Sequence, residues 1–132
     1  MKEIDFYSGF EGEPSVVLYG NDEVIYIWNG YFTPIMDIML EVEVNKFGSA
    51  FGMVAEWHTC TGWCEDSSKC KVENLDAEID AFSRFDWEKF NKPQYEHIND
   101  DWKNVCRKVH EEMLKLFKKA KEQEFDVYIE SD

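Results

Sequence analysis

The stretch NDDWKNVCRKVHEEMLKLFKKAKEQE, residues 99–124, decides the fold that the sequence predicts. Its apolar residues recur at steps of three and four, which is the spacing of one face of an α-helix. They are Trp102, Val105, Cys106, Val109, Met113, Leu116, Phe117 and Ala120. Asn99 is a suitable N-cap, and lysines gather in the last turns, where the helix dipole favours cations. The stretch therefore predicts a long amphipathic helix whose apolar face packs against another layer of structure.

Two segments nearer the N-terminus have the composition of β-strands. Residues 16–19 (VVLY) and 24–28 (VIYIW) are β-branched and aromatic, and residues 20–22 (GND) between them are typical of a turn. The pair Asn29-Gly30 follows the second segment and is a strong hairpin signal, because both residues tolerate positive φ. These segments predict an antiparallel hairpin followed by a second tight turn.

Three further segments also fit strands. Residues 40–44 (LEVEV) alternate strictly, so Glu41 and Glu43 are expected to face solvent while the apolar residues face a core. Residues 49–57 form another apolar run, and residues 125–130 alternate again after the long helix. All the strand-like segments together predict a meander of ordinary size.

The fold class that follows is α+β. We expect an antiparallel β-sheet of about four to five strands, covered on one face by the long C-terminal amphipathic helix. A length of 132 residues fits a single domain over residues 1–132. Hydrophobic residues make up 44% and aromatic residues 16%, which excludes a disordered acidic chain, because such chains have few aromatics.

Residues 74–83 fit two structures. Asp76, Glu78 and Asp80 alternate with apolar residues as on a strand, but the composition and the capping residue Asn74 favour a short helix. On a strand the three acids would form a row spaced like the phosphates along a nucleic-acid strand, about 6.6 Å apart. On a helix the first and third acids would be neighbours, and the second would turn away from them.

The acidic charge is large and segregated. There are 28 acidic and 14 basic residues, and the net charge of −14 excludes a protein that binds nucleic acid directly. Residues 1–68 carry 2 basic and 12 acidic side chains, whereas residues 103–121 carry 7 basic and 2 acidic ones. Solubility alone is one explanation, and recognition of a basic partner is the other. For that partner, the candidate binding residues are Glu41, Glu43, Glu65, Asp66, Asp76, Glu78 and Asp80.

A cluster of one histidine and three cysteines is the clearest candidate metal site. His58, Cys60, Cys64 and Cys70 form a Cys₃His set, which zinc can bind tetrahedrally as a structural ion. The cluster lacks the usual CxxC spacing, and the alternative is a loop of reduced, buried thiols without a cofactor. Cys106 lies on the apolar stripe of the long helix and is expected in the core.

Enzyme function has little support in the sequence. The chain contains no HExxH, GxSxG, P-loop or zinc-deaminase motif, and no catalytic residue is assigned. A cysteine–histidine nucleophile stays open, because such partners meet only in the fold. Its candidates are Cys60 or Cys64 with His97 or His110. The carboxylates at residues 65–66, or those of Asp76, Glu78 and Asp80, are a further open alternative, as ligands for Mg²⁺.

The N-terminus shows no basic stretch leading into an apolar run, so no secretory signal is expected. The longest apolar run, residues 24–28, is far shorter than the roughly 20 residues that span a bilayer. We therefore expect a cytoplasmic protein without membrane contact. For a protein encoded by a phage, this would be the cytoplasm of the infected host cell.

These observations favour a non-enzymatic acidic inhibitor that binds a basic nucleic-acid-handling protein, such as a nuclease, by charge complementarity or DNA mimicry. A phage anti-CRISPR or anti-restriction protein has these properties. An immunity protein against a nuclease toxin has them as well, because both classes present carboxylates to a cationic site. A zinc-stabilised protein-interaction module is the third alternative.

Overall fold

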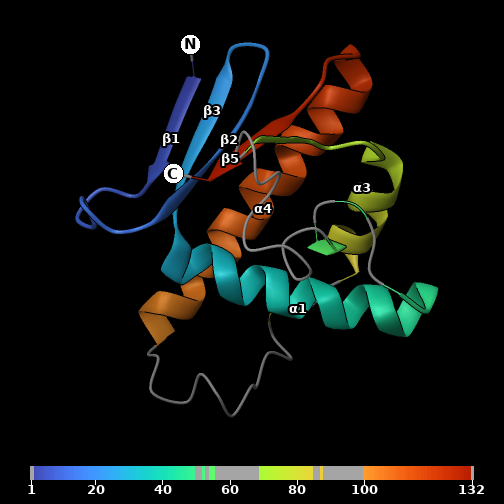
Figure 1. Ribbon diagram of the computed structural model, residues 1–132, viewed down its shortest axis with the longest axis horizontal. Coiled ribbons are helices and arrows are strands. Elements are labelled where there is room, and N and C mark those ends of the chain that lie inside the picture. The colour runs from blue at the N-terminus through green and yellow to red at the C-terminus, as the bar shows by residue number, and fades with distance from the viewer. Residues whose placement is uncertain are drawn as a thin grey trace.

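The computed structural model describes residues 2–49, 52, 54–55, 69–84, 87 and 100–131 (Figure 1). The strands in these residues are β1 (Lys2–Phe6), β2 (Ser15–Gly20), β3 (Glu23–Trp28), β4 (Lys69–Lys71) and β5 (Tyr128–Ser131). The labelled helices are α1 (Asn29–Phe47), α3 (Leu75–Ser83) and α4 (Asp100–Gln123). The fold is α+β, as the sequence predicts, with helices packed against a β-sheet.

The sheet has five strands in the order β1-β3-β2-β5-β4. Neighbouring strands run antiparallel except at one edge, where β1 lies parallel to β3. The expected antiparallel hairpin of β2 and β3 is present, with Asn21 at positive φ in the turn. The last described strand, β5, pairs with both β2 and β4, so it is an interior strand of the sheet.

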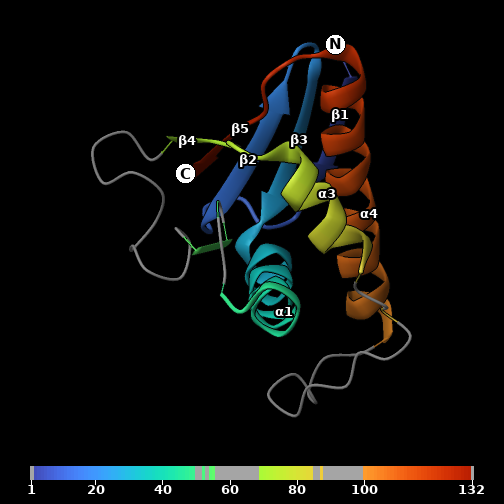
Figure 2. The ribbon, with the colours of Figure 1, turned by 90° about the vertical axis from the view of Figure 1, so that its right-hand side faces the viewer.

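The long helix α4 has the position and the orientation that its apolar stripe predicts. Val109, Met113 and Phe117 are fully buried, and they form one core with the inward residues of β2 and β3. Figure 2 shows α4 and α3 on one side of the sheet. The core therefore lies between the sheet and the helices.

The sequence predictions at residues 29–30 and 40–44 are wrong, because both segments lie in helix α1. The expected turn at Asn29-Gly30 is the first turn of this helix, and the expected strand at residues 40–44 is part of its C-terminal half. The apolar residues of this helix recur at helical spacing from its first turns onward, over a longer stretch than the five alternating residues LEVEV. The buried residues of α1 are Phe32, Pro34, Ile35, Met36, Ile38, Met39 and Glu43. Gly48, at φ 88°, ends the helix in the left-handed conformation that favours glycine.

Of two further predictions, the helix at residues 75–83 is confirmed and the strand at residues 49–57 is wrong where it is described. Residues 75–83 form the predicted short helix α3, and the Asn74 Oδ1 atom accepts a hydrogen bond from the Ala77 N–H at 3.1 Å. The strand expected at residues 49–57 is wrong where it is described, because Gly52, Val54 and Ala55 are helical. The other residues of that segment, except Ser49, lie outside the described part of the chain.

Candidate interaction surface

Two of the acids expected at a binding surface lie inside the protein. Glu43 is 0% exposed and Glu78 is 1% exposed, so the expectation that they face solvent is wrong. Glu43 lies on α1 four residues after the buried Met39, and Glu78 lies on the buried side of α3, four residues before Phe82. The helical period therefore places both carboxyl groups in the interior, although their local alternation is typical of an exposed strand face.

Burial makes Glu78 a neutral group at pH 7. Loss of hydration, with a smaller contribution from the nearby Glu43, raises the pKa of Glu78 to about 9. Both carboxyl oxygens of Glu78 are buried, and neither has a hydrogen-bond partner among the described residues. The backbone of Gly52 packs so closely that a Cβ atom there would lie 2.8 Å from Glu78 Oε1. Glu78 thus cannot act as an acidic contact for a partner in this structure.

The expected row of acids in residues 76–80 does not form. Asp76 and Asp80 lie on helix α3, where Asp76 pairs with Lys121 and Asp80 pairs with Arg84 at 3.0 Å. Glu41 is exposed on α1. The two other candidates, Glu65 and Asp66, lie outside the described residues. The acids named from the sequence are therefore not gathered on one surface in the part of the chain that the structure describes.

Most of the expected zinc site falls outside the described chain. His58, Cys60 and Cys64 are not described, and Cys70 lies in β4 with its side chain not described. Among the described residues, no group of three or more metal-ligating side chains is arranged to hold an ion. Structural zinc therefore stays a prediction of the sequence. Cys106 lies in the core as expected, fully buried, and burial raises the pKa of its thiol.

His110 is a core histidine. Its side chain is 4% exposed, and its ring stacks on Phe82 with ring centroids 5.1 Å apart and meets Trp87 edge-on at 5.9 Å. Burial lowers the pKa of His110 to about 4, although a hydrogen bond with the Phe82 backbone opposes the shift. Cys60, Cys64 and His97, the other members of the possible nucleophile pairs, are not described.

The two faces of the sheet differ. Over β2, β3 and β5 one face is buried against the helices, and its apolar residues there, 0–2% exposed, are Val16, Leu18, Ile25, Ile27 and Ile129. Alternation along each strand places the intervening residues on the opposite face, which we call the open sheet face. Its residues with described side chains are Glu3, Asp5, Ser15, Val17, Tyr19, Val24, Tyr26, Trp28, Lys71, Tyr128 and Glu130. The labelled helices pack on the buried face (Figures 1 and 2).

The register of the strands aligns these residues in two rows across the open sheet face. By register, one row runs Glu3, Val24, Tyr19, Tyr128, Lys71, and the other runs Asp5, Tyr26, Val17, Glu130, Lys69. The three tyrosines are half-buried, and Tyr19 stacks on Tyr128 with ring centroids 5.7 Å apart. The aromatic centre of this face is thus bordered by exposed carboxylates on β1 and by Glu130 on β5.

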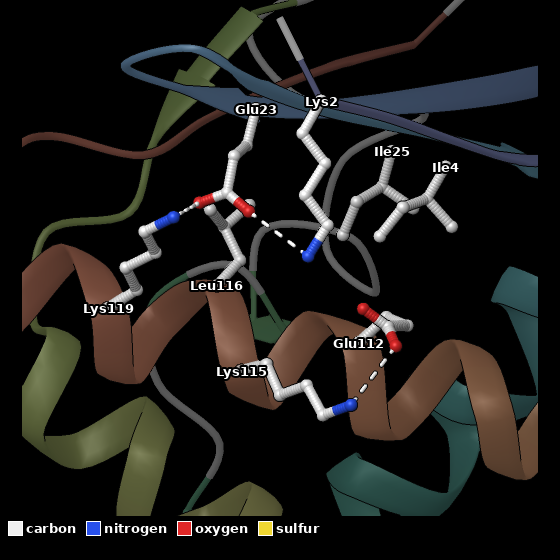
Figure 3. Close-up of a pocket in the computed structure, with 8 residues that line it drawn as sticks. All are labelled: Lys2, Ile4, Glu23, Ile25, Glu112, Lys115, Leu116 and Lys119. Atoms are coloured by element: carbon white, nitrogen blue, oxygen red, sulfur yellow. Dashed lines mark hydrogen bonds and ion pairs between the residues drawn. The ribbon is translucent and has the colours of Figure 1, made fainter.

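A pocket of about 230 Å³ lies on the helix side of the sheet, between β1, β3 and α4 (Figure 3). Its apolar residues are Ile4, Ile25 and Leu116, and its charged residues are Lys2, Glu23, Glu112, Lys115 and Lys119. Glu23 lies between two lysines, 3.5 Å from Lys2 Nζ and 2.9 Å from Lys119 Nζ. Lys115 pairs with Glu112 at 3.3 Å. Salt bridges therefore neutralise most of the charge around an apolar floor.

Comparisons of the chain with protein-family models, with curated proteins and with solved structures find no match. The described helices include none that is both long and apolar enough to cross a membrane.

Proposed function

We propose that the protein is a non-enzymatic acidic inhibitor, which binds a basic nucleic-acid-handling protein such as a nuclease through its open sheet face. The observation that carries this proposal is the arrangement of the face. Tyr19 stacks on Tyr128 at its centre, and Tyr26 lies on the neighbouring strand β3 in the adjacent row. Glu3 and Asp5 lie on the β1 side, and Glu130 and Lys71 lie on the opposite side. The face thus joins an acidic β1 side to an aromatic centre, a combination that a charge present for solubility alone would not require.

Each part of the open sheet face suits a basic partner. Tyrosine gives a large contact area with few rotatable bonds, and tyrosines are enriched in the cores of interfaces. Arginine, the residue that basic grooves use to hold phosphates, stacks on aromatic rings and forms bidentate pairs with carboxylates. The net charge of −14 would speed the encounter with such a partner and make association depend on salt.

The buried ionisable groups fit a binding role better than a catalytic one. Glu78 and His110 have the strongly shifted pKa values expected of catalytic groups, but both are less than 5% exposed. Each is held in its neutral form at pH 7 by burial, and neither faces the open sheet face. An anti-CRISPR or anti-restriction protein and an immunity protein would use this surface in the same way, and the identity of the captured nuclease separates them.

Capture from host lysate at low and at high salt tests the proposal. The immobilised protein should capture a basic nuclease, and capture should weaken steeply as salt rises. Tyr26→Ala should reduce capture about tenfold or more, because a central aromatic contact contributes about 2 kcal/mol or more. Phe47→Ala is the matched control, because it removes an exposed aromatic ring from α1, away from this face. Salt-independent capture, or equal loss in the two variants, would overturn the proposal.

A further inference from the structure

Strand β1 forms one end of the sheet, and its outer side pairs with no strand of the described chain (Figure 1). The Lys2 N–H donates a hydrogen bond to the Asp22 carbonyl at 2.8 Å, so the backbone groups of Lys2 point toward β3. Along a β-strand, successive residues direct their backbone N–H and C=O groups alternately to one side of the strand and to the other. The backbone N–H and C=O groups of Glu3 and Asp5 therefore point away from the sheet, along its free edge.

The two sides of this edge have different chemistry. On the open sheet face the edge carries the exposed carboxylates of Glu3 and Asp5. The Asp5 carboxylate accepts hydrogen bonds from the N–H groups of Tyr7 and Ser8, which fixes its position at 2.7 and 2.9 Å from these donors. On the helix side the same edge borders the pocket, whose floor is formed by Ile4 with apolar residues of β3 and α4 (Figure 3).

This geometry is that of a strand-addition site. In strand addition, backbone hydrogen bonds along a free edge provide affinity, and pockets for alternate side chains provide specificity. An added strand would direct every second side chain toward Glu3 and Asp5, and the others toward the pocket. The side chains that face Glu3 and Asp5 would have to be cationic. Of the side chains on the other side, the one that enters the pocket would be aliphatic, because the floor of the pocket is apolar.

We propose that the free edge of β1 binds an extended basic segment of the partner, in which lysine or arginine alternates with aliphatic residues. This inference rests on the proposed function, since it names the part of the basic partner that docks. A second copy of this chain is a poor occupant, because antiparallel pairing of two β1 edges would bring Glu3 and Asp5 of both copies together. Like charges opposite each other destabilise paired strands.

A short synthetic peptide that alternates lysine and leucine is the probe for this site. We expect it to shift the amide resonances of Glu3 and Asp5 and to slow their hydrogen exchange. A peptide of the same composition in scrambled order should bind much more weakly. Methylation of the peptide nitrogens that face β1 should abolish binding, and this test leaves the protein unchanged. Equal binding of the scrambled or the methylated peptide would overturn the proposal, as would a free protein that dimerises through β1.

Glu3→Pro tests the same edge from the protein side. Proline at this position removes an outward N–H and no hydrogen bond to β3, so β1 should still pair. Glu3→Gln is the matched control, because it removes the same charge and keeps the N–H. We expect Glu3→Pro to bind the peptide about tenfold more weakly than Glu3→Gln. Equal affinities of the two variants would contradict strand addition.

The lysate experiment separates this inference from the proposed function. If Glu3→Pro and Glu3→Gln capture the basic partner equally, the inhibitor proposal stands and docking at the edge of β1 is wrong. If the wild-type protein shows no salt-dependent capture but binds the alternating peptide at Glu3 and Asp5, the docking mode stands and the inhibitor proposal is wrong.

Discussion

Glu78 and His110 are the two described side chains whose burial couples protonation to folding most directly. Folding raises the pKa of Glu78 from 4.5 to about 9, so between these values the folded protein keeps a proton that the unfolded chain has lost. Stability therefore falls as pH rises through this window. Folding lowers the pKa of His110 from 6.5 to about 4, so His110 makes stability fall as pH drops between those values. The two effects oppose each other from pH 4.5 to 6.5, and above that range only Glu78 acts.

We predict that Glu78→Gln removes this pH dependence. The free energy of unfolding of the wild-type protein, measured with urea from pH 6.5 to 9, should fall by at most about 1.4 kcal/mol per pH unit. Glutamine has nearly the same shape and no charge, so the variant should keep its stability across that range and exceed the wild type at the alkaline end. Asp76→Asn, which removes an exposed acid from the same helix, should keep the wild-type slope. A slope in Glu78→Gln equal to that of the wild type would contradict this account.

At the scale of the elements, the sequence predicts best where the hydrophobic period extends over a whole segment. Helix α4 and the β2–β3 hairpin have such patterns, and both form as predicted. The prediction fails in α1, because the alternation at residues 40–44 covers only five residues of a helix that extends from Asn29 to Phe47. The Asn-Gly signal fails there for a different reason, since Gly30 is needed for close packing against the ring of Trp28 and not for a turn.

Gly30→Ala tests this explanation of α1. Helix propensity alone predicts that alanine stabilises a helix relative to glycine by about 1 kcal/mol. In the structure a Cβ atom on residue 30 would collide with the ring of Trp28, which stacks on Phe10 with ring centroids 3.8 Å apart. We therefore expect Gly30→Ala to destabilise the protein by about 1–3 kcal/mol in chemical denaturation. A stabilised variant would show that the contact between Gly30 and Trp28 does not constrain the start of α1.

At the scale of the whole molecule, the sequence predicts an acidic interface for a basic partner, but the acids that it names do not lie together on one surface of the described chain. Lys115 and Lys119 line the pocket on the helix side of the sheet, opposite the open sheet face. The composition of that face depends on which strands are neighbours, because β1 comes from the start of the chain and β5 from its end. No local pattern predicts that Tyr19, Tyr26 and Tyr128 lie together. The positions of these tyrosines depend on which distant strands pair, and the pattern within a single segment does not predict that pairing.

The most direct test of the central claim compares two variants of equal net charge in the capture assay. Glu3→Gln with Asp5→Asn removes two charges from the edge of the open sheet face, and asparagine can still cap the loop after β1. Glu111→Gln with Glu122→Gln removes two charges from exposed positions of α4. We predict that the first double variant loses about tenfold or more in affinity for the captured nuclease, whereas the second binds like the wild type. Equal affinities of the two double variants would contradict the claim, because binding would then follow net charge and not the open sheet face.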